Sequence, residues 1–301
     1  MEKIKKFIRN NELAFKVVKP CFCFLLKVLF WTKVFFDDRG IMRYYFIYPL
    51  ESLYRVVRAK IQPEYLEGIK GLRNKYKGER CFIVASGPSL KLEDINTLYK
   101  EGEYSFGLNS IYCLYAKTDW RPDFYCCIDL ELEREIEEQQ GVVAFEKLGK
   151  RKTFLDSRVK TVPKTEKVEF IHYNRLLHGF GVWDNDFKYS DDLIYGLYDM
   201  YDVTITTIQI AKYMGFSEVY LLGVDCDYGG EKRYIDGAEM DSALKLQNDY
   251  YEYMQKQKKA GFQFLKNSIE KDGDFKIHNA TRGGKLEIFP RVDFDKLFLE
   301  E

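Results

Sequence analysis

A turn of small residues, Ala85-Ser86-Gly87-Pro88-Ser89, has the residue types best suited to hold a ligand in this chain. It follows the apolar run Cys81–Val84, which predicts a buried strand, and precedes Leu90–Tyr99, which predicts a helix that the serine could cap. Its glycine permits a sharp turn and a close approach of the backbone to a ligand, and its proline restricts φ. Unpaired N–H groups and the helix dipole at such a turn would favour an anion. An ordinary strand-to-helix connection has the same pattern, so both interpretations stay open.

Other polar residues also stand directly after predicted strands. Asn109 follows Tyr104–Leu108, Asp129 follows Asp123–Ile128, and Asp225 closes the apolar run that begins at Val219. The carboxyl ends of parallel strands meet at one edge of a sheet, which is where ligands bind in open α/β folds. We therefore expect these side chains to converge with the small-residue turn on one cleft.

The remaining chain alternates strand-like and helix-like segments. This order predicts an α/β protein with a Rossmann-like, doubly wound, mostly parallel sheet. Asn174–Asp202 is aromatic and irregular, which is typical of a loop over a site. Gly215 is a suitable end for the helix before it. The further predicted helices are Ile111–Ala116, Glu131–Gln140, Thr204–Met214 and Asp241–Lys266, and the further strands are Lys152–Leu155, Val168–His172, Lys276–Ile277 and Leu286–Phe289.

Composition describes a folded protein. The 301 residues are 46% hydrophobic and 31% charged, which excludes a disordered chain and allows one large or two modest domains. Seven cysteines lack metal-binding spacing, and their odd number favours reduced thiols in a cytoplasmic protein. Aromatic residues make up 16% of the chain, a share that is compatible with contacts to sugars, nucleobases or membranes and does not distinguish among them.

The first part of the chain is basic. Residues 1–60 contain 13 Lys or Arg against 5 Asp or Glu, a charge of +8 in a chain whose net charge is zero. Pro20–Phe36 is too short and too charged for a confident membrane span. Lys16, Lys19, Lys27 and Lys33 would share an arc of roughly 120° on a helix, interrupted by Pro20, opposite Phe, Leu and Val. We expect residues 1–75 to form a basic amphipathic region on the inner, cytoplasmic face of the cell membrane, or else an arm that packs on the domain or on another subunit in a homo-oligomer.

Residues 76–301 are then the Rossmann-like domain, and their net acidic charge argues against nucleic acid as a partner. Within this part, four segments resemble the bacterial family 42 sialyltransferases. They resemble even more closely the domain of unknown function 115 proteins, a group with motility-associated flagellin glycosyltransferases and 6-hydroxymethylpterin diphosphokinase-like proteins. The resemblance runs from about Arg80 to Val292 and implies a GT-A-variant, sialyltransferase-like fold. It is carried by GPSL at 87–90, Asn109, LLGVDCDYGGEKRYIDG at 221–237, and the segments Asn279–Gly284 and Phe289–Val292.

The resemblance implies a site for a nucleotide sugar activated by CMP. The turn at 86–89 would hold the phosphate and ribose, and Asn109 would contact the nucleotide or sugar. Tyr228 and Tyr234 stand near the spacing of two tyrosines that donate hydrogen bonds to the departing phosphate. Such phenol donors stabilise developing negative charge without a metal. The full set of expected donor-binding residues is Ser86, Gly87, Pro88, Ser89, Asn109, Asp129, Thr204, Asp225, Asn279 and Thr281.

The family's histidine base is absent from the corresponding interval, because the three histidines are His172, His178 and His278. Asp236 is the nearest carboxylate on the same loop and could accept a proton from an acceptor hydroxyl. His278, beside Asn279, is the alternative.

The sequence thus favours a bacterial-type glycosyltransferase that moves a sialic-acid-like or other CMP-activated acidic sugar to a surface glycan or glycolipid, with no metal required. A first alternative is an ATP-dependent, 6-hydroxymethylpterin diphosphokinase-like enzyme, whose Mg²⁺ could lie on Asp129, Asp225 and Asp227. A second is a nucleotide-sugar-binding scaffold without catalysis, which the missing histidine would explain.

Overall fold

The computed structural model describes most of the chain beyond residue 65. The described residues are 53, 57, 66–159, 161–172, 187, 189–194, 196–198, 200, 202–226, 234–238, 248–269, 271 and 273–299, with side chains from 255 onward in the helix that begins at 248. The chain divides into two compact units, and the unit Leu72–Tyr173 with Phe187–Glu301 contains the whole sheet. The expected division at residue 75 stays a prediction.

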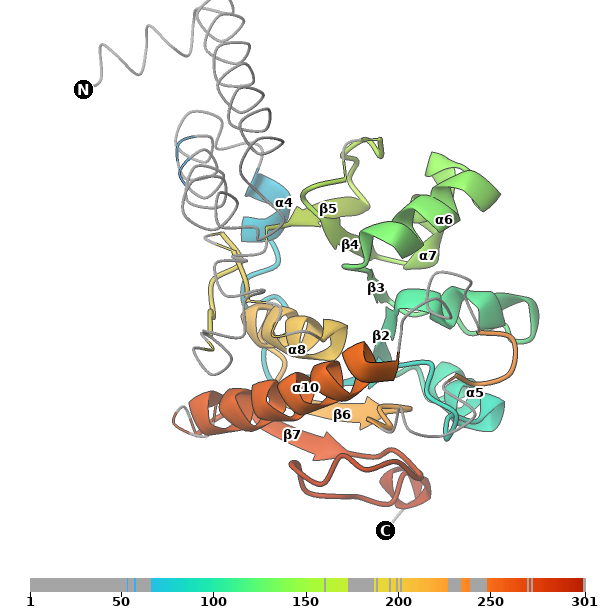
Figure 1. Ribbon diagram of the computed structural model, residues 1–301, viewed down its shortest axis with the longest axis vertical. Helices are drawn as coiled ribbons and strands as arrows, with labels where there is room; N and C mark the ends of the chain where they lie inside the picture. The colour runs from blue at the N-terminus through green and yellow to red at the C-terminus, as the bar shows by residue number, and fades with distance from the viewer. Residues whose placement is uncertain are drawn as a thin grey trace, which may run out of the picture. The chain divides into compact units, whose positions relative to one another are not determined.

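Seven strands form one sheet in the order β5-β4-β3-β2-β1-β6-β7, and every pairing is parallel. This confirms the predicted α/β fold (Figure 1). The chain builds outward from β1 in one direction through β2 to β5, then returns to the other side of β1 with β6. The point between β1 and β6 is therefore the topological switch point, where open α/β sheets have a crevice. The strands are β1 Arg80–Val84, β2 Tyr104–Leu108, β3 Phe124–Cys126, β4 Lys152–Asp156, β5 Val168–Ile171, β6 Glu218–Leu222 and β7 Lys276–Asn279.

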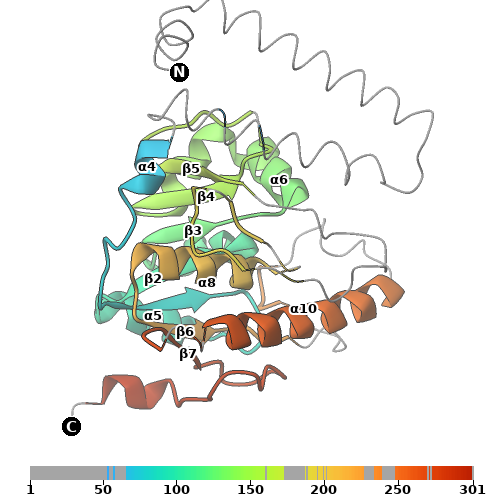
Figure 2. The same ribbon diagram turned by 90° about the vertical axis from the view of Figure 1, so that its left-hand side faces the viewer.

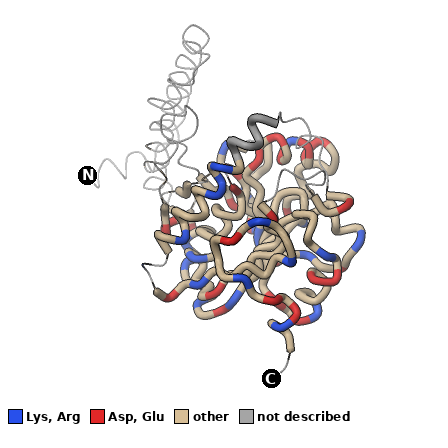
Figure 3. Tube along the Cα trace, turned by 60° about the horizontal axis from the view of Figure 1, so that its bottom comes forward, with Lys and Arg blue, Asp and Glu red and all other residues tan. Residues whose placement is uncertain are grey.

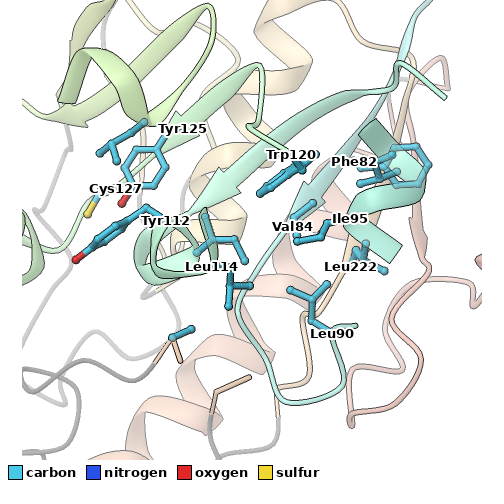
Figure 4. Close-up of a cluster of buried hydrophobic side chains, with 14 of the residues drawn as sticks. Phe82, Val84, Leu90, Ile95, Tyr112, Leu114, Trp120, Tyr125, Cys127 and Leu222 are labelled. Atoms are coloured by element: carbon cyan, nitrogen blue, oxygen red, sulfur yellow. The ribbon is translucent and has the colours of Figure 1, made fainter. Parts of the chain in front are cut away.

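Helices cover both faces of the sheet. On one face, α8 packs against β1 and β2, and α10 packs on α8 (Figure 2). On the other, apolar residues of α5, η3, α6 and α7 join alternate residues of the strands in one buried cluster. Figure 4 shows part of it, with Leu90 beside Val84 and Leu222. The helices are α4 Glu67–Lys70, α5 Leu92–Lys100, α6 Leu130–Gln140, α7 Phe145–Leu148, α8 Val203–Met214 and α10 Asn248–Ile269, with 3₁₀ turns η3 Asn109–Ala116, η4 Val142–Ala144 and η6 Asp295–Phe298.

Two local predictions are wrong. Leu286–Phe289 is not a strand: the Leu286 carbonyl accepts the side-chain amide of Asn279 at 2.7 Å, and Arg291, beyond Pro290, forms an isolated parallel bridge to Asn279 instead. Ser89 does not cap α5, because the helix begins later, after Lys91, which makes no side-chain capping bond.

Other boundaries follow local chemistry. Gly215 ends α8 with φ of 92°, a left-handed conformation that glycine adopts without strain. Along the described trace, basic and acidic residues are interspersed (Figure 3). None of the helices among the described residues is long and apolar enough to cross a membrane. Nearly all of the basic region at 1–60 lies outside those residues.

Candidate functional site

The turn after β1 is held by bonds within the protein. The N–H of Gly87 donates to Gly223 O at 3.0 Å, that of Leu90 to Gly87 O at 3.1 Å, and that of Ser89 to Asp225 Oδ2 at 3.2 Å. Pro88 has no N–H to offer. The expected anion cradle of unpaired N–H groups is therefore wrong for these three residues, because their donors already have acceptors.

Gly87 is needed for a close approach, but the approaching groups belong to the protein. A Cβ at this position would lie 2.0 Å from Asp225 Oδ2 and 2.4 Å from Gly223 O. The turn after β1 thus packs directly on the turn after β6. The two turns form one unit at the switch point.

Hydrogen-bond acceptors gather at this unit. Ser89 Oγ and Asn109 Oδ1 are buried and have no hydrogen-bond partner among the described atoms. Ser86 Oγ lies 3.0 Å from Ser110 Oγ, which joins the end of β1 to the residue after Asn109. Asn109 has φ of 46°, a left-handed conformation uncommon for any residue but glycine. Buried polar atoms without partners are rare in proteins, so these two are candidates for ligand contacts.

The segment 234–238 lies beside the same turn. Ile235 N donates to Ser86 O at 2.9 Å, and Tyr234 packs against the core at its edge. Asp236 is exposed, and its backbone carbonyl accepts Lys117 Nζ at 2.8 Å. The structure therefore places the segment with Tyr234 and Asp236, two residues that the sequence predicts at the site, beside the turn after β1. Tyr228 and Asp227 lie outside the described residues.

Asn279 and Thr281 hold the turn after β6 in place. Thr281 Oγ1 accepts the N–H of Val224 at 3.1 Å, and Asn279 Oδ1 accepts the N–H of Thr281 at 3.0 Å. Both side chains are buried, at 0% and 4% exposure. Their polar atoms hold the turn after β6, so the structure gives them a supporting position.

Three expected residues do not join this group. Asp129 caps α6, with Oδ1 accepting Glu131 N at 2.9 Å, and it follows β3, three strands away from β6. At about 4.8 Å per strand this is a separation of roughly 14 Å from Asp225. Thr204 is buried in the first turn of α8, where its N–H donates to Asp202 Oδ1 at 2.7 Å.

His278 is the third. Its ring stacks on Tyr220 within the sheet, with centroids 4.9 Å apart, and burial lowers the pKa of its imidazole. Tyr220 stands two residues before the end of β6. The Nδ1 of His278 is buried without a hydrogen-bond partner among the described atoms, and stacking on Tyr220 holds the ring in the sheet.

A second polar cluster lies at the same edge of the sheet, at the ends of β3 and β4. Glu133 is 2% exposed, its Oε1 accepts the N–H of Asp156 at 3.1 Å, and its Oε2 has no hydrogen-bond partner among the described atoms. Burial, and then the nearby Asp156 carboxylate, raise the pKa of Glu133 to about 9. Asp156 itself is paired with Arg158 at 2.9 Å. Glu133 is therefore a neutral acid at pH 7.

Sequence reasoning did not place Glu133, Arg282 or Arg291 at this edge. A signal existed for Glu133, because it shares a helical face with Leu132 and Ile136, which are buried. Both arginines stand in segments that carry the family resemblance, Asn279–Gly284 and Phe289–Val292, but their partners depend on how the chain folds back after β7.

The fold and the geometry of the site define a class of protein: a Rossmann-like α/β protein with a polar site at the topological switch point of its sheet. The chain belongs to the 6-hydroxymethylpterin diphosphokinase MptE-like family, which residues 59–231 match. No curated protein matches it.

Two solved structures are similar in part. One is a MAf glycosyltransferase from Magnetospirillum magneticum AMB-1, with 17% identity and a TM-score of 0.46 over 76% of this chain and 36% of the other. The chain thus spans little more than a third of that protein. The other is a mammalian sialyltransferase in complex with Gal-beta-1-3GalNAc-ortho-nitrophenol, with 11% identity and a TM-score of 0.31 over 78% of this chain and 86% of the other.

Proposed function

We propose that this protein is a glycosyltransferase that uses a nucleotide sugar, with a CMP-linked acidic sugar as the donor. The observation that carries the proposal is the set of polar groups at the switch point: the Ser89 hydroxyl, which can donate and accept, and the acceptors Asn109 Oδ1 and the Asp225 carboxylate. Acceptors match the hydroxyl groups of a ribose or sugar, which donate hydrogen bonds. Phosphate oxygens are acceptors themselves, so a phosphate here would need donors such as the Ser89 hydroxyl and the Tyr234 phenol, which stand on neighbouring segments.

The proposed reaction is a direct displacement with inversion. The acceptor hydroxyl attacks the anomeric carbon as the bond to the CMP phosphate breaks, and Asp236 accepts the hydroxyl proton. Tyr228 and Tyr234 donate hydrogen bonds to the departing phosphate, where negative charge grows. The exposed position of Asp236 next to the turn supports this role, and the acceptor would be a surface glycan or glycolipid.

The family description favours a second candidate, diphosphate transfer from ATP to a pterin. That reaction would need Mg²⁺ on carboxylates. The expected trio of Asp129, Asp225 and Asp227 does not fit one ion, because Asp129 is separated from Asp225 by two intervening strands. A metal would have to use Asp225 and Asp227 without Asp129.

A thermal-shift screen with CMP, CTP, UDP, GDP and ATP, each with and without Mg²⁺, discriminates these functions. A ligand that binds only the folded state raises the unfolding midpoint. We expect a shift with CMP in the presence of EDTA. A shift with ATP alone, dependent on Mg²⁺, would favour the diphosphokinase.

Turnover of Asp236→Asn and Tyr234→Phe then tests the chemistry. Loss of the base should reduce turnover by about 10²–10⁴-fold and loss of the phenol donor by on the order of 10²-fold, with CMP affinity nearly unchanged. Full activity of Asp236→Asn would place the base elsewhere. CMP binding without any transfer to a glycan acceptor would instead support a non-catalytic scaffold.

We also propose that residues 1–60 attach the protein to the cytoplasmic face of the membrane through their +8 charge and aromatic residues. Binding of the full chain to anionic vesicles should weaken with added salt, because salt screens the attraction. Binding that salt does not weaken would point to an inserted segment, and no binding would leave the region as an oligomerisation arm.

A further inference from the structure

The loop after β7 carries two arginines with different tasks. Arg282 pairs with the buried Asp94 of α5 at 2.8 Å and also with Asp295, so it fixes the outer side of the loop. Arg291 forms an ion pair with Glu287 at 2.7 Å and also turns toward the loop backbone. Its Nη1 donates to Thr281 O at 3.1 Å and Gly283 O at 3.0 Å, and its Nη2 donates to Gly284 O at 3.1 Å.

The carbonyls that Arg291 gathers belong to the part of the loop that touches the site. Lys285 N donates to Asp225 O at 2.6 Å, and a Cβ at Gly284 would lie 2.5 Å from Asp225 Cα. A Cβ at Gly283 would lie 3.3 Å from Ser89 Cβ. The loop backbone is thus the wall against which Asp225 and Ser89 rest.

We propose that Arg291 is a positioning residue of the nucleotide-sugar site, which holds residues 281–285 in the shape that keeps Asp225 and Ser89 in place for the ligand. This inference rests on the proposed function. A planar guanidinium can bind three carbonyls at fixed angles, whereas the ammonium of a lysine cannot reproduce that fork. Arg291 acts through the loop and does not itself contact the ligand.

The chain offers a matched control in Arg121. It also donates to three backbone carbonyls, those of Tyr115, Thr118 and Trp120, at 2.7–3.0 Å. It stands just before β3, at the opposite edge of the sheet from the site. Replacing Arg121 therefore disturbs a guanidinium that binds three carbonyls of segment 115–120, whose Lys117 contacts the Asp236 carbonyl, and leaves the wall behind Asp225 unchanged.

The test compares Arg291→Lys and Arg121→Lys in the full chain by CMP titration, unfolding midpoint and hydrogen exchange. We expect Arg291→Lys to bind CMP about tenfold more weakly. Amide exchange at 283–285 should accelerate, and methylguanidinium added to Arg291→Ala should restore part of the affinity. Arg121→Lys should lose a similar amount of thermal stability and keep the affinity of the parent.

Each of the remaining outcomes would contradict either the positioning role of Arg291 or the proposed function. Unchanged affinity in Arg291→Lys overturns the positioning role, and so does an equal loss in Arg121→Lys, which would reflect general destabilisation. Weaker binding without faster exchange at 283–285 would also overturn it, because Arg291 would then contact the ligand directly. If the parent chain binds neither CMP nor another nucleotide, the proposed function fails and this inference fails with it.

Discussion

At the end of β6, the Asp225 carboxyl accepts the N–H of Ser89 and lies against the Cα of Gly87. Near the end of β4, by contrast, the Glu133 carboxyl keeps one oxygen without a hydrogen-bond partner in the described part of the chain. Both groups are less than 10% exposed, at 7% and 2%, and both lie at the carboxyl edge of the same sheet. The difference lies in the backbone around them. A glycine turn brings an N–H to Asp225, while α6 buries Glu133 against β4 with a single donor. The stability of the first region therefore depends on close packing of the backbone, and the stability of the second depends on the protonation of the Glu133 carboxyl.

The largest effect should come from crowding the first region. Gly87→Ala would place a methyl group against Asp225 Oδ2 and Gly223 O, so we expect a loss of about 2–4 kcal/mol in the free energy of unfolding. Urea denaturation measures it. Gly102→Ala is the control, because its Cβ meets nothing within 4 Å and only its φ of 68° is unfavourable. That variant should lose about 1 kcal/mol. Equal losses in both would contradict the packing of the two turns.

An intermediate effect, of opposite sign, should come from Glu133→Gln. The folded-state pKa of Glu133, about 9, is above its unfolded value of 4.5, so its contribution to stability is fully present below pH 4.5 and is lost as pH rises toward 9. The free energy of unfolding of the parent should therefore fall as pH rises through this window. A glutamine keeps the acceptor for the Asp156 N–H, so the variant should be more stable at about pH 8 and have a flatter profile.

Urea denaturation between about pH 5 and 9 checks this. Glu131→Gln, an exposed change on the same helix, should follow the parent. A Glu133→Gln variant with the parent's slope would show that another group carries the pH dependence.

The smallest expected effect distinguishes Asp225 from Asp129, two aspartates that both follow predicted strands in the sequence. Asp225→Asn alters the carboxyl that accepts the Ser89 N–H, and we expect CMP to bind about tenfold more weakly, a change of about 1.4 kcal/mol. Asp129→Asn keeps a good N-cap for α6 and lies roughly 14 Å from that site by strand spacing, so affinity and stability should stay within about 0.5 kcal/mol of the parent. Calorimetric titration with CMP measures both. A comparable loss in Asp129→Asn would mean that the ligand spans four strands.

Much of the sheet could be predicted because its strands are short apolar runs that end in polar residues. Tyr104–Leu108 was predicted with its observed bounds, and Asp225 was expected beside the turn after β1 because both follow strands. The pairing of Ser89 N–H with Asp225 could not be predicted, since it joins residues 136 positions apart. That bond takes one of the three N–H donors that the expected anion cradle would have needed. Leu286–Phe289 has the composition of a strand, but the carbonyl of its first residue is taken by the Asn279 side chain, which composition cannot show.

The position of β1 between β2 and β6 also affects how this protein is made. One side of β1 pairs with β2, the next strand along the chain, but its other side pairs with Glu218–Leu222, which is synthesised more than a hundred residues later. At 5–20 residues per second, a ribosome needs roughly 5–30 s to produce that partner. During this time the nascent chain carries an apolar strand edge, Cys81–Val84, open to other chains. Yield of correctly folded protein should therefore depend on the speed of translation and on chaperones more strongly than its final stability suggests.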